Sequence, residues 1–217
     1  MHVELVNGSP RRNGSTSAAL REVEKILQEE GIGTHVFLVG AKPLAGCLGC
    51  GKCARLGRCV FDDSVNEFRE RARRADGFVF GSPVHYAAVS GHMKAFMDRL
   101  FFSEFTGCAN QAFRLKPAAG IVAARRSGTV AAFSQLNKYF TIQEMFVVSS
   151  RYWNNVFALE ADDVPEDGEG LMNMRVLARS MAYFLRCQEA ARKAGVPLPK
   201  TEDPVFTNFT RRQETKA

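Results

Sequence analysis

Two spacings of apolar residues alternate along the chain. Short apolar runs are typical of buried strands, and apolar residues three and four positions apart are typical of helices. The short runs predict strands at residues 3–7, 35–39, 78–80, 118–124 and 145–148. The helical spacing predicts helices at residues 16–30, 63–75, 91–101, 130–140 and 171–194. This order predicts an α/β fold in which helices cover both faces of a parallel sheet.

These units form one predicted domain over residues 1–194, with a cysteine-rich loop at residues 41–60 inserted after the second strand. From residue 195 the chain holds three prolines and many polar residues. We therefore expect residues 195–217 to be a C-terminal tail.

The composition narrows the class of protein. With 46% apolar and 24% charged residues, it is that of an ordinary globular protein. The first residues lead directly into a strand pattern, and no run approaches the roughly 18 apolar residues of a membrane helix. We therefore expect a cytoplasmic protein that does not contact a membrane. In that reducing compartment, its six cysteines favour metal or redox chemistry over disulfides.

The net charge is +6, from 29 Lys and Arg against 23 Asp and Glu. Nucleic-acid binding needs these charges gathered on one face, whereas here they are scattered along the chain. Small anionic cofactors are the favoured partners, and nucleic acid is not expected.

The segment after the first strand is a candidate phosphate site. In doubly wound sheets, ligands bind where the strands end, and the free N–H groups of a helix N-terminus suit an anion. Hydroxyl, amide and guanidinium groups add donors at Ser9, Arg11, Arg12, Asn13, Ser15 and Thr16. The spacing between Gly8 and Gly14 excludes a Walker A loop, and no dinucleotide fingerprint is present. A plain turn with a helix cap is the alternative reading.

Two blocks carry a family resemblance. Residues 8–16 resemble the FMN-phosphate loop of the NADPH-dependent FMN reductase and iron-sulfur flavoprotein families. Residues 81–86, followed by Ser90, Lys94, Asp98 and Arg99, are similar to the second flavin loop of these families and its helix. The resemblance spans residues 3–194. It implies a flavodoxin-like, doubly wound sheet of five parallel strands in the order 2-1-3-4-5.

The resemblance also implies where the flavin lies. It assigns the ribityl chain and ring to Ser82, Pro83, Val84, His85, Tyr86 and Ser90. It places the pyrimidine end near Ala124, Arg126 and Gly128, and a cation there would favour the reduced anion. At least one of Arg125 and Arg126 is expected to face solvent, and by residue type alone Tyr86 could equally be a turn aromatic. No catalytic side chain is assigned, because hydride reaches flavin N5 without a protein acid.

Four of the cysteines, Cys47, Cys50, Cys53 and Cys59, have the spacing C-x2-C-x2-C-x5-C. The first three spacings are those of bacterial ferredoxin loops, and the resemblance to iron-sulfur flavoproteins implies a [4Fe–4S] cluster. Structural zinc more often uses two separated C-x2-C pairs. The cluster is favoured, with empty thiols and then zinc as the alternatives. Cys108 and Cys187 are expected to be ordinary small residues, buried or half-buried.

The function expected is an FMN-dependent oxidoreductase. It takes electrons from NAD(P)H as co-substrate or from a ferredoxin, and passes them through FMN and the cluster to a small acceptor. The alternatives are a cluster-free quinone, azo or flavin reductase, a flavodoxin-like electron carrier, and a zinc-stapled binding module. The resemblance implies a homodimer or homotetramer.

Overall fold

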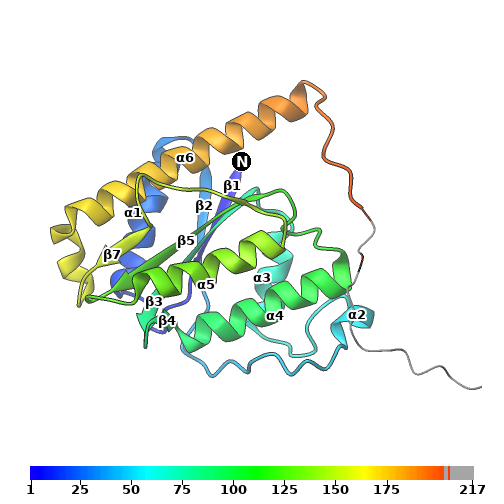
Figure 1. Ribbon diagram of the computed structural model, residues 1–217, viewed down its shortest axis with the longest axis horizontal. Coiled ribbons are helices and arrows are strands. Elements are labelled where there is room, and N and C mark those ends of the chain that lie inside the picture. Colours follow the sequence, from blue (N-terminus) through cyan, green and yellow to red (C-terminus); the bar gives the residue numbers. More distant parts are fainter. Residues whose placement is uncertain (203–204, 206–217) are drawn as a thin grey trace, which may run out of the picture.

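A largely parallel sheet forms the centre of the protein (Figure 1). The structure, a computed structural model, describes residues 1–202 and residue 205. The strands are β1 (His2–Asn7), β2 (Gly33–Leu38), β3 (Gly77–His85), β4 (Ala88–Val89), β5 (Pro117–Ala124), β6 (Phe146–Val147) and β7 (Asn155–Phe157). The main path runs β2-β1-β3-β5-β6 with every pair parallel. The predicted flavodoxin-like order is confirmed, with β5 and β6 as the fourth and fifth strands of the prediction.

The sheet has two additions that the five-strand prediction lacked. β3 continues to His85 instead of ending at residue 80, and it turns back as the antiparallel β4. The fifth strand is split, because β6 pairs with the start of β5 and β7 pairs with its end. β4 and β7 have only two and three residues, too few to show an apolar spacing. Both additions extend the sheet at the end where β1, β3 and β5 finish.

The helices form a layer on each face. α1 (Ser15–Glu29) and α6 (Gly168–Lys193) pack on one face, and α3 (Ser64–Ala72), α4 (Gly91–Cys108) and α5 (Thr129–Ile142) pack on the other. Figure 1 shows α6 along one margin of the molecule and α4 along the opposite one. Successive strand residues serve opposite faces: Val79 joins the α1–α6 core, while Phe78 and Phe80 join the other core.

The two faces differ in composition. Aliphatic side chains and methionines fill the core beside α1 and α6. The opposite core contains an aromatic cluster whose rings lie within 4.7–6.5 Å of one another. Its members are Phe37, Phe68, Phe78, Phe80, Phe96, Phe101, Phe113 and Phe140. This rigid packing holds α4 against the sheet, and α4 carries contacts to both candidate sites.

Two short helices were not predicted. α2 (Cys53–Leu56) lies in the cysteine-rich loop, and the 3₁₀ helix η1 (Ala161–Glu166) follows β7. α6 begins at Gly168, three residues earlier than expected, because the Asp167 side chain accepts the Gly170 N–H and caps it. Of the predicted tail, residues 195–202 and 205 form no helix or strand, and the rest lies outside the described residues. Among the helices described here, none is long and apolar enough to cross a membrane.

Candidate functional site

The loop between β1 and α1 is shaped by hydrogen bonds from its own side chains. Asn7 Oδ1 accepts the Ser9 N–H at 2.9 Å, and Ser9 Oγ accepts the Arg11 N–H at 3.1 Å. The Gly8 N–H donates to the carbonyl of Gly81 at 2.8 Å, which ties this loop to β3. Gly14, at the N-cap of α1, has no side chain to accept the N–H groups of the first turn. These groups are therefore available to an anion, and the helix end favours one.

Ser90 joins this loop to the second one. Its hydroxyl donates to the carbonyl of Gly8 at 2.7 Å and accepts the Met93 N–H at 3.1 Å, so it also caps α4. The Ser90 N–H in turn donates to Ser82 Oγ at 3.0 Å. Both serines are fully buried. They hold the ends of β1 and β3 together from beneath, and they do not line the cavity described next.

Glycines allow this close approach. A Cβ on Gly8 would lie 2.6 Å from Met93 Cε, and one on Gly81 would lie 3.0 Å from Leu20 and Thr16 side-chain atoms. The two strand ends therefore meet α1 and α4 at distances that only glycine permits.

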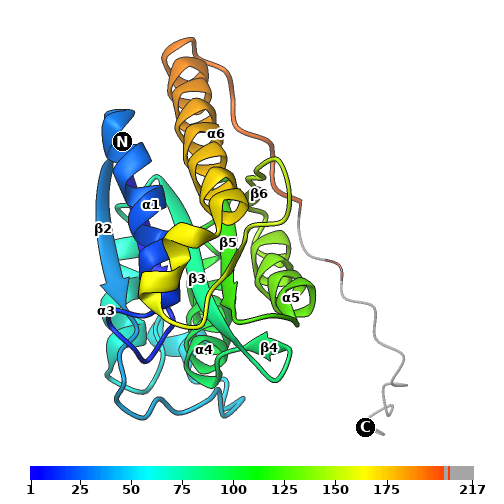
Figure 2. The ribbon, with the colours of Figure 1, turned by 90° about the vertical axis from the view of Figure 1, so that its left-hand side faces the viewer.

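A cavity of about 420 Å³ opens where the strands end, and we call it the cofactor cavity. Its volume is typical of sites that bind a small molecule or cofactor. It is lined by Ser9, Pro10, Arg11, Gly14, Ser15, Thr16, Pro83, Val84, His85, Ala123, Ala124, Arg125, Ala158, Leu159 and Glu160. The uncapped start of α1 forms one wall, and the end of β3 and the loop after β5 form others (Figure 2). At its mouth Arg11 pairs with Glu160 at 3.3 Å, with both side chains more than 60% exposed.

Eight of the predicted flavin residues line this cavity, and seven do not. The lining ones are Ser9, Arg11, Ser15, Thr16, Pro83, Val84, His85 and Ala124. Arg12 and Asn13 lie on the solvent side of the first loop, and Ser82 and Ser90 are buried beneath it. Arg126 is exposed, while its neighbour Arg125 lines the cavity. Of the two arginines, Arg125 is the one that lines the cavity.

Tyr86 and Gly128 also lie outside the lining of this cavity. Tyr86 and Ala87 have φ values of 50° and 57°, which form the tight turn between β3 and β4 and direct the Tyr86 ring fully into solvent. Gly128 has φ +87°, and a Cβ there would lie 2.8 Å from Ala87 Cα. Gly128 therefore lets this turn rest on the start of α5, and neither residue lines the cavity.

Sequence reasoning missed the wall formed by Ala158, Leu159 and Glu160. These residues follow β7, a three-residue strand without a sequence signal of its own. Their place was determined by the pairing of β7 with the end of β5.

The cysteine-rich loop, residues 41–60, runs along the outside of α4 (Figure 1). Cys47 and Cys50 are exposed, Cys59 is half-buried, and Cys53 is buried at the start of α2. All four line one small hollow of about 20 Å³, together with Arg99, Phe102 and Ser103 of α4. Four thiols on a glycine-rich loop suit a cluster or zinc by their chemistry. Within the described residues, however, no three His, Cys, Asp or Glu side chains form a group that could hold a metal ion.

Two of these thiols have polar partners on α4. Cys53 Sγ lies 3.1 Å from Thr106 Oγ1, and Arg99 Nε donates to Cys59 Sγ at 3.2 Å. The Arg99 side chain is only 1% exposed and forms two hydrogen bonds to Asp63, at 2.7 and 2.9 Å. Burial lowers the pKa of Arg99, but its hydrogen bonds with Asp63 and Cys59 outweigh burial and raise the pKa overall. Arg99 therefore stays charged beside the hollow.

The remaining cysteines lie elsewhere. Cys187 is exposed on α6. Cys108 ends α4, receives a hydrogen bond from Arg69 at 2.8 Å and donates to the Gly57 carbonyl at 3.2 Å. Cys108 thus supports the end of the cysteine-rich loop without joining its hollow.

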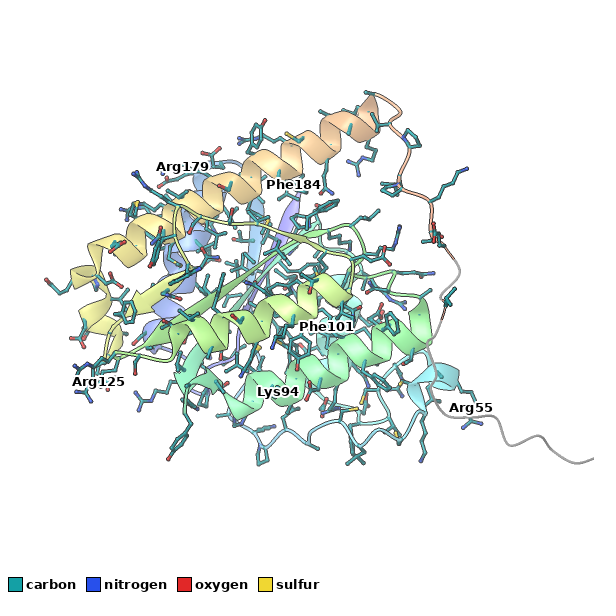
Figure 3. All side chains as sticks on the ribbon, in the orientation of Figure 1. Arg55, Lys94, Phe101, Arg125, Arg179 and Phe184 are labelled. Carbon is teal, nitrogen blue, oxygen red and sulfur yellow. The ribbon has the colours of Figure 1, made fainter. Side chains whose placement is uncertain are left out.

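The two candidate sites lie at different ends of the molecule. In Figure 3, Arg125 of the cofactor cavity and Arg55, close to Cys53 on α2, appear at opposite sides of the view. α4 connects them, since Ser90 caps its start and Thr106 lies near its end.

The strand order and the cavity at the strand ends define a flavodoxin-like α/β protein with a cofactor-sized site. Residues 1–159 match the family model of the NADPH-dependent FMN reductases, and the chain belongs to this family.

Named relatives and solved structures agree with this family. An iron-sulfur flavoprotein of Methanocaldococcus jannaschii is 31% identical over 195 residues, covering 86% of this chain and 98% of that protein. An iron-sulfur flavoprotein of Methanosarcina thermophila is 24% identical, covering 85% and 95%. RosB with a bound riboflavin-phosphate intermediate superposes with TM-score 0.65 at 16% identity, covering 100% and 98% of the two chains. FerB, an NAD(P)H:(acceptor) oxidoreductase of Paracoccus denitrificans, gives 0.65 at 15%, covering 86% and 97%. At these identities the two structures show a shared fold.

Proposed function

We propose that the protein is an FMN-dependent oxidoreductase that takes electrons from NAD(P)H or a ferredoxin and delivers them to a small acceptor. A [4Fe–4S] cluster on the four cysteines is part of this proposal. The observation that carries the FMN proposal is the uncapped start of α1, which with Ser9, Ser15 and Thr16 forms one end of the cofactor cavity.

The residues of the cavity suit the parts of FMN. The phosphate would be held by the N–H groups of α1, the three hydroxyls and Arg11. Hydrogen bonds from N–H and hydroxyl donors are stronger when the acceptor is charged. Pro83, Val84 and Ala124 offer apolar surface to the ring, and Arg125 adds positive charge at the edge. When bound, FMN supplies the chemistry of accepting an electron pair and releasing electrons singly.

The chain's own residues then bind and orient the cofactor. His85 is exposed at the cavity wall, where it suits packing or a hydrogen bond. Ser82 and Ser90 act from beneath by fixing the two loops, and Tyr86 lies beyond the cavity at the turn. We assign no side chain as an acid or base.

The cluster proposal has separate support. Four thiols line one hollow, and relatives covering most of this chain are named iron-sulfur flavoproteins. Cys47, Cys50, Cys53 and Cys59 would be the ligands. The hollow has room for about one water molecule, so cluster binding requires Cys47 and Cys50 to move on their exposed loop.

A homodimer or homotetramer in the cytoplasm completes the proposal. Large exposed side chains next to the cofactor cavity offer surface for contact between copies. They include Tyr152, Trp153, Phe157 and Leu159, which are 42–63% exposed.

The phosphate contact is tested by replacing Ser15 and Thr16 together with alanine. Hydrogen bonds to a charged group contribute about 1.5–3 kcal/mol, so we expect FMN affinity to fall at least about tenfold. The measurement is a titration of FMN fluorescence. The matched control replaces Ser134 and Thr141, both exposed on α5, and should bind as the wild type does. Unchanged affinity in the Ser15–Thr16 variant would contradict the proposed site.

A cluster-free reductase is the second candidate, favoured by the absence of a compact metal-ligand group among the described residues. Consumption of NADPH or NADH with a small quinone separates an enzyme from a carrier. Turnover with FMN bound, without iron or sulfide, would establish the second candidate. Bound FMN with no turnover by NADPH, NADH or a reduced ferredoxin would instead indicate an electron carrier.

A further inference from the structure

We infer that Arg99 is a positioning residue for the cysteine site: it orients Cys59 toward the hollow and keeps a positive charge buried behind it. This inference rests on the proposed function, because it concerns the cluster that the four thiols would hold.

The Arg99 guanidinium holds the cysteine-rich loop near both of its ends. Its Nη1 donates to the carbonyl of Ala45, two residues before the first thiol, at 3.3 Å. Its Nη2 approaches the carbonyl of Phe61, two residues after the last thiol, at 3.5 Å. The ring of Phe61 also lies against it, with 4.8 Å between the guanidinium carbon and the ring centroid. One planar group therefore fixes the points where the loop leaves and rejoins the fold.

Asp63 fixes the guanidinium itself. Its two carboxylate oxygens accept from Nη1 and Nη2, and Oδ1 also accepts the Val65 N–H at the start of α3. Only arginine can form this set of contacts, because its planar guanidinium donates two parallel hydrogen bonds to one carboxylate and a third in another direction. A lysine ammonium cannot do this. The third donor is Nε, and it is directed at Cys59 Sγ at 3.2 Å.

The contact with Cys59 goes beyond what holding the loop requires. Asp63 and the two carbonyls already account for the loop's anchorage. The backbone of Cys59 is fixed by Asn66 of α3, whose Oδ1 accepts the Cys59 N–H at 3.1 Å and whose Nδ2 donates to the Cys59 carbonyl at 2.9 Å. The bond from Arg99 Nε adds a constraint on the thiol itself.

The buried charge has a predictable effect on a bound cluster. Cluster potentials depend on hydrogen bonds to sulfur, nearby charge and solvent exposure, and a cation with an N–H donor favours the reduced, more negative state. Lys52, Arg55 and Arg58 are also close in sequence, but they are exposed and therefore screened by solvent. Arg99, at 1% exposure, is not screened by solvent, but its charge is paired with Asp63, so the Nε donor to Cys59 Sγ carries the effect on the potential.

The test compares the anaerobically purified holoprotein with Arg99→Lys. We expect unchanged FMN content, a shift of the cluster midpoint potential to more negative values, and a broadened electron paramagnetic resonance signal from loosely held Cys59. The matched control is Arg71→Lys, which alters a similar paired contact, to Glu4 at 3.0 and 3.2 Å, outside the cysteine-rich loop. It should have the wild-type potential.

Asp63→Glu keeps the test decisive if Arg99→Lys also loses FMN, because it displaces the guanidinium without removing it. We expect a smaller shift in the same direction. The inference is overturned if Arg99→Lys folds and has the wild-type potential and signal. If Arg99→Lys does not fold, the same result in Asp63→Glu overturns it. Wild-type protein that binds FMN but no iron or sulfide would instead overturn the proposed cluster, and this inference with it.

Discussion

The cofactor cavity and the cysteine-rich loop are built in different ways. The cavity is formed where strands end, and buried serines and glycines fix its walls from beneath. The cysteine-rich loop lies outside the sheet, and it is held by a few side chains of α4 and α3. The cavity already has about 420 Å³, whereas the hollow between the thiols has about 20 Å³. The first region is thus an open cavity, while a metal or cluster at the second would have to bring the thiols together.

The largest expected effect comes from removing one of the four thiols, and it should affect the cysteine-rich loop without affecting the cofactor cavity. Cys53→Ser or Cys59→Ser removes a ligand from a four-thiol site, so we expect loss of most of the bound iron and sulfide. FMN content should stay at the wild-type level, because neither residue lines the cofactor cavity. Iron, sulfide and FMN assays check both statements. Cys187→Ser, on exposed α6, is the control, and an equal loss of FMN in the Cys53 or Cys59 variants would show that the regions are not independent.

Gly8→Ala should damage the cavity and the fold together. The added Cβ would lie 2.8 Å from Met93 Cβ, which is attached directly to the α4 backbone, so α4 must shift, which costs about 1–3 kcal/mol. We expect a lower free energy of unfolding in urea and FMN affinity weakened about tenfold or more. Gly168→Ala is the control, because no atom lies within 4 Å of a Cβ there. If both variants bind FMN equally well, the close approach of β1 and α4 does not shape the cavity.

Ser90→Ala should have a smaller effect of the same kind. It removes the cap of α4 and the donor to Gly8, and a helix cap contributes about 1 kcal/mol. We expect a similar loss in the free energy of unfolding and a few-fold weaker FMN binding, with the cluster signal unchanged. Ser134→Ala, at an exposed position of α5, serves for comparison. A shifted cluster potential in Ser90→Ala would mean that α4 couples the two regions.

A fall in pH should lower the free energy of unfolding of the whole fold, and so affect both regions alike. Burial raises the pKa of Glu4, but hydrogen bonds from Arg71, His2 and His35 outweigh it and leave the pKa below its ordinary value of 4.5. A lowered folded-state pKa stabilises the protein above the ordinary value, and this contribution is lost as pH falls from there through the folded-state value. We expect Glu4→Gln to flatten the loss of unfolding free energy below about pH 4.5. Wild-type and variant curves with equal slopes would exclude Glu4 as the cause.

The parts of the site predicted from sequence are those set by local structure. Ser9, Ser15 and Thr16 lie within one strand–loop–helix unit, and Pro83 to His85 continue a buried strand, so their neighbours in sequence determine their place. The strand order followed from the family resemblance and was confirmed.

The parts that sequence could not give depend on distant contacts. The position of Leu159 depends on the pairing of β7 with β5. The contact between Arg99 and Cys59 joins residues 40 positions apart, and nothing in the sequence around Arg99 indicated it. The sequence did not indicate the positive φ values of the turn at Tyr86, which direct its ring outward. In each case the deciding partner lies in another element, and no local spacing encodes it.

The most direct test of the account is the cofactor content of the protein purified without oxygen. The account predicts about one FMN per chain, with about four iron and four sulfide ions, and an absorption spectrum in which flavin bands overlie a broad cluster shoulder. A chain without FMN would contradict the assignment of the cofactor cavity. One zinc without sulfide would contradict the assignment of the four cysteines.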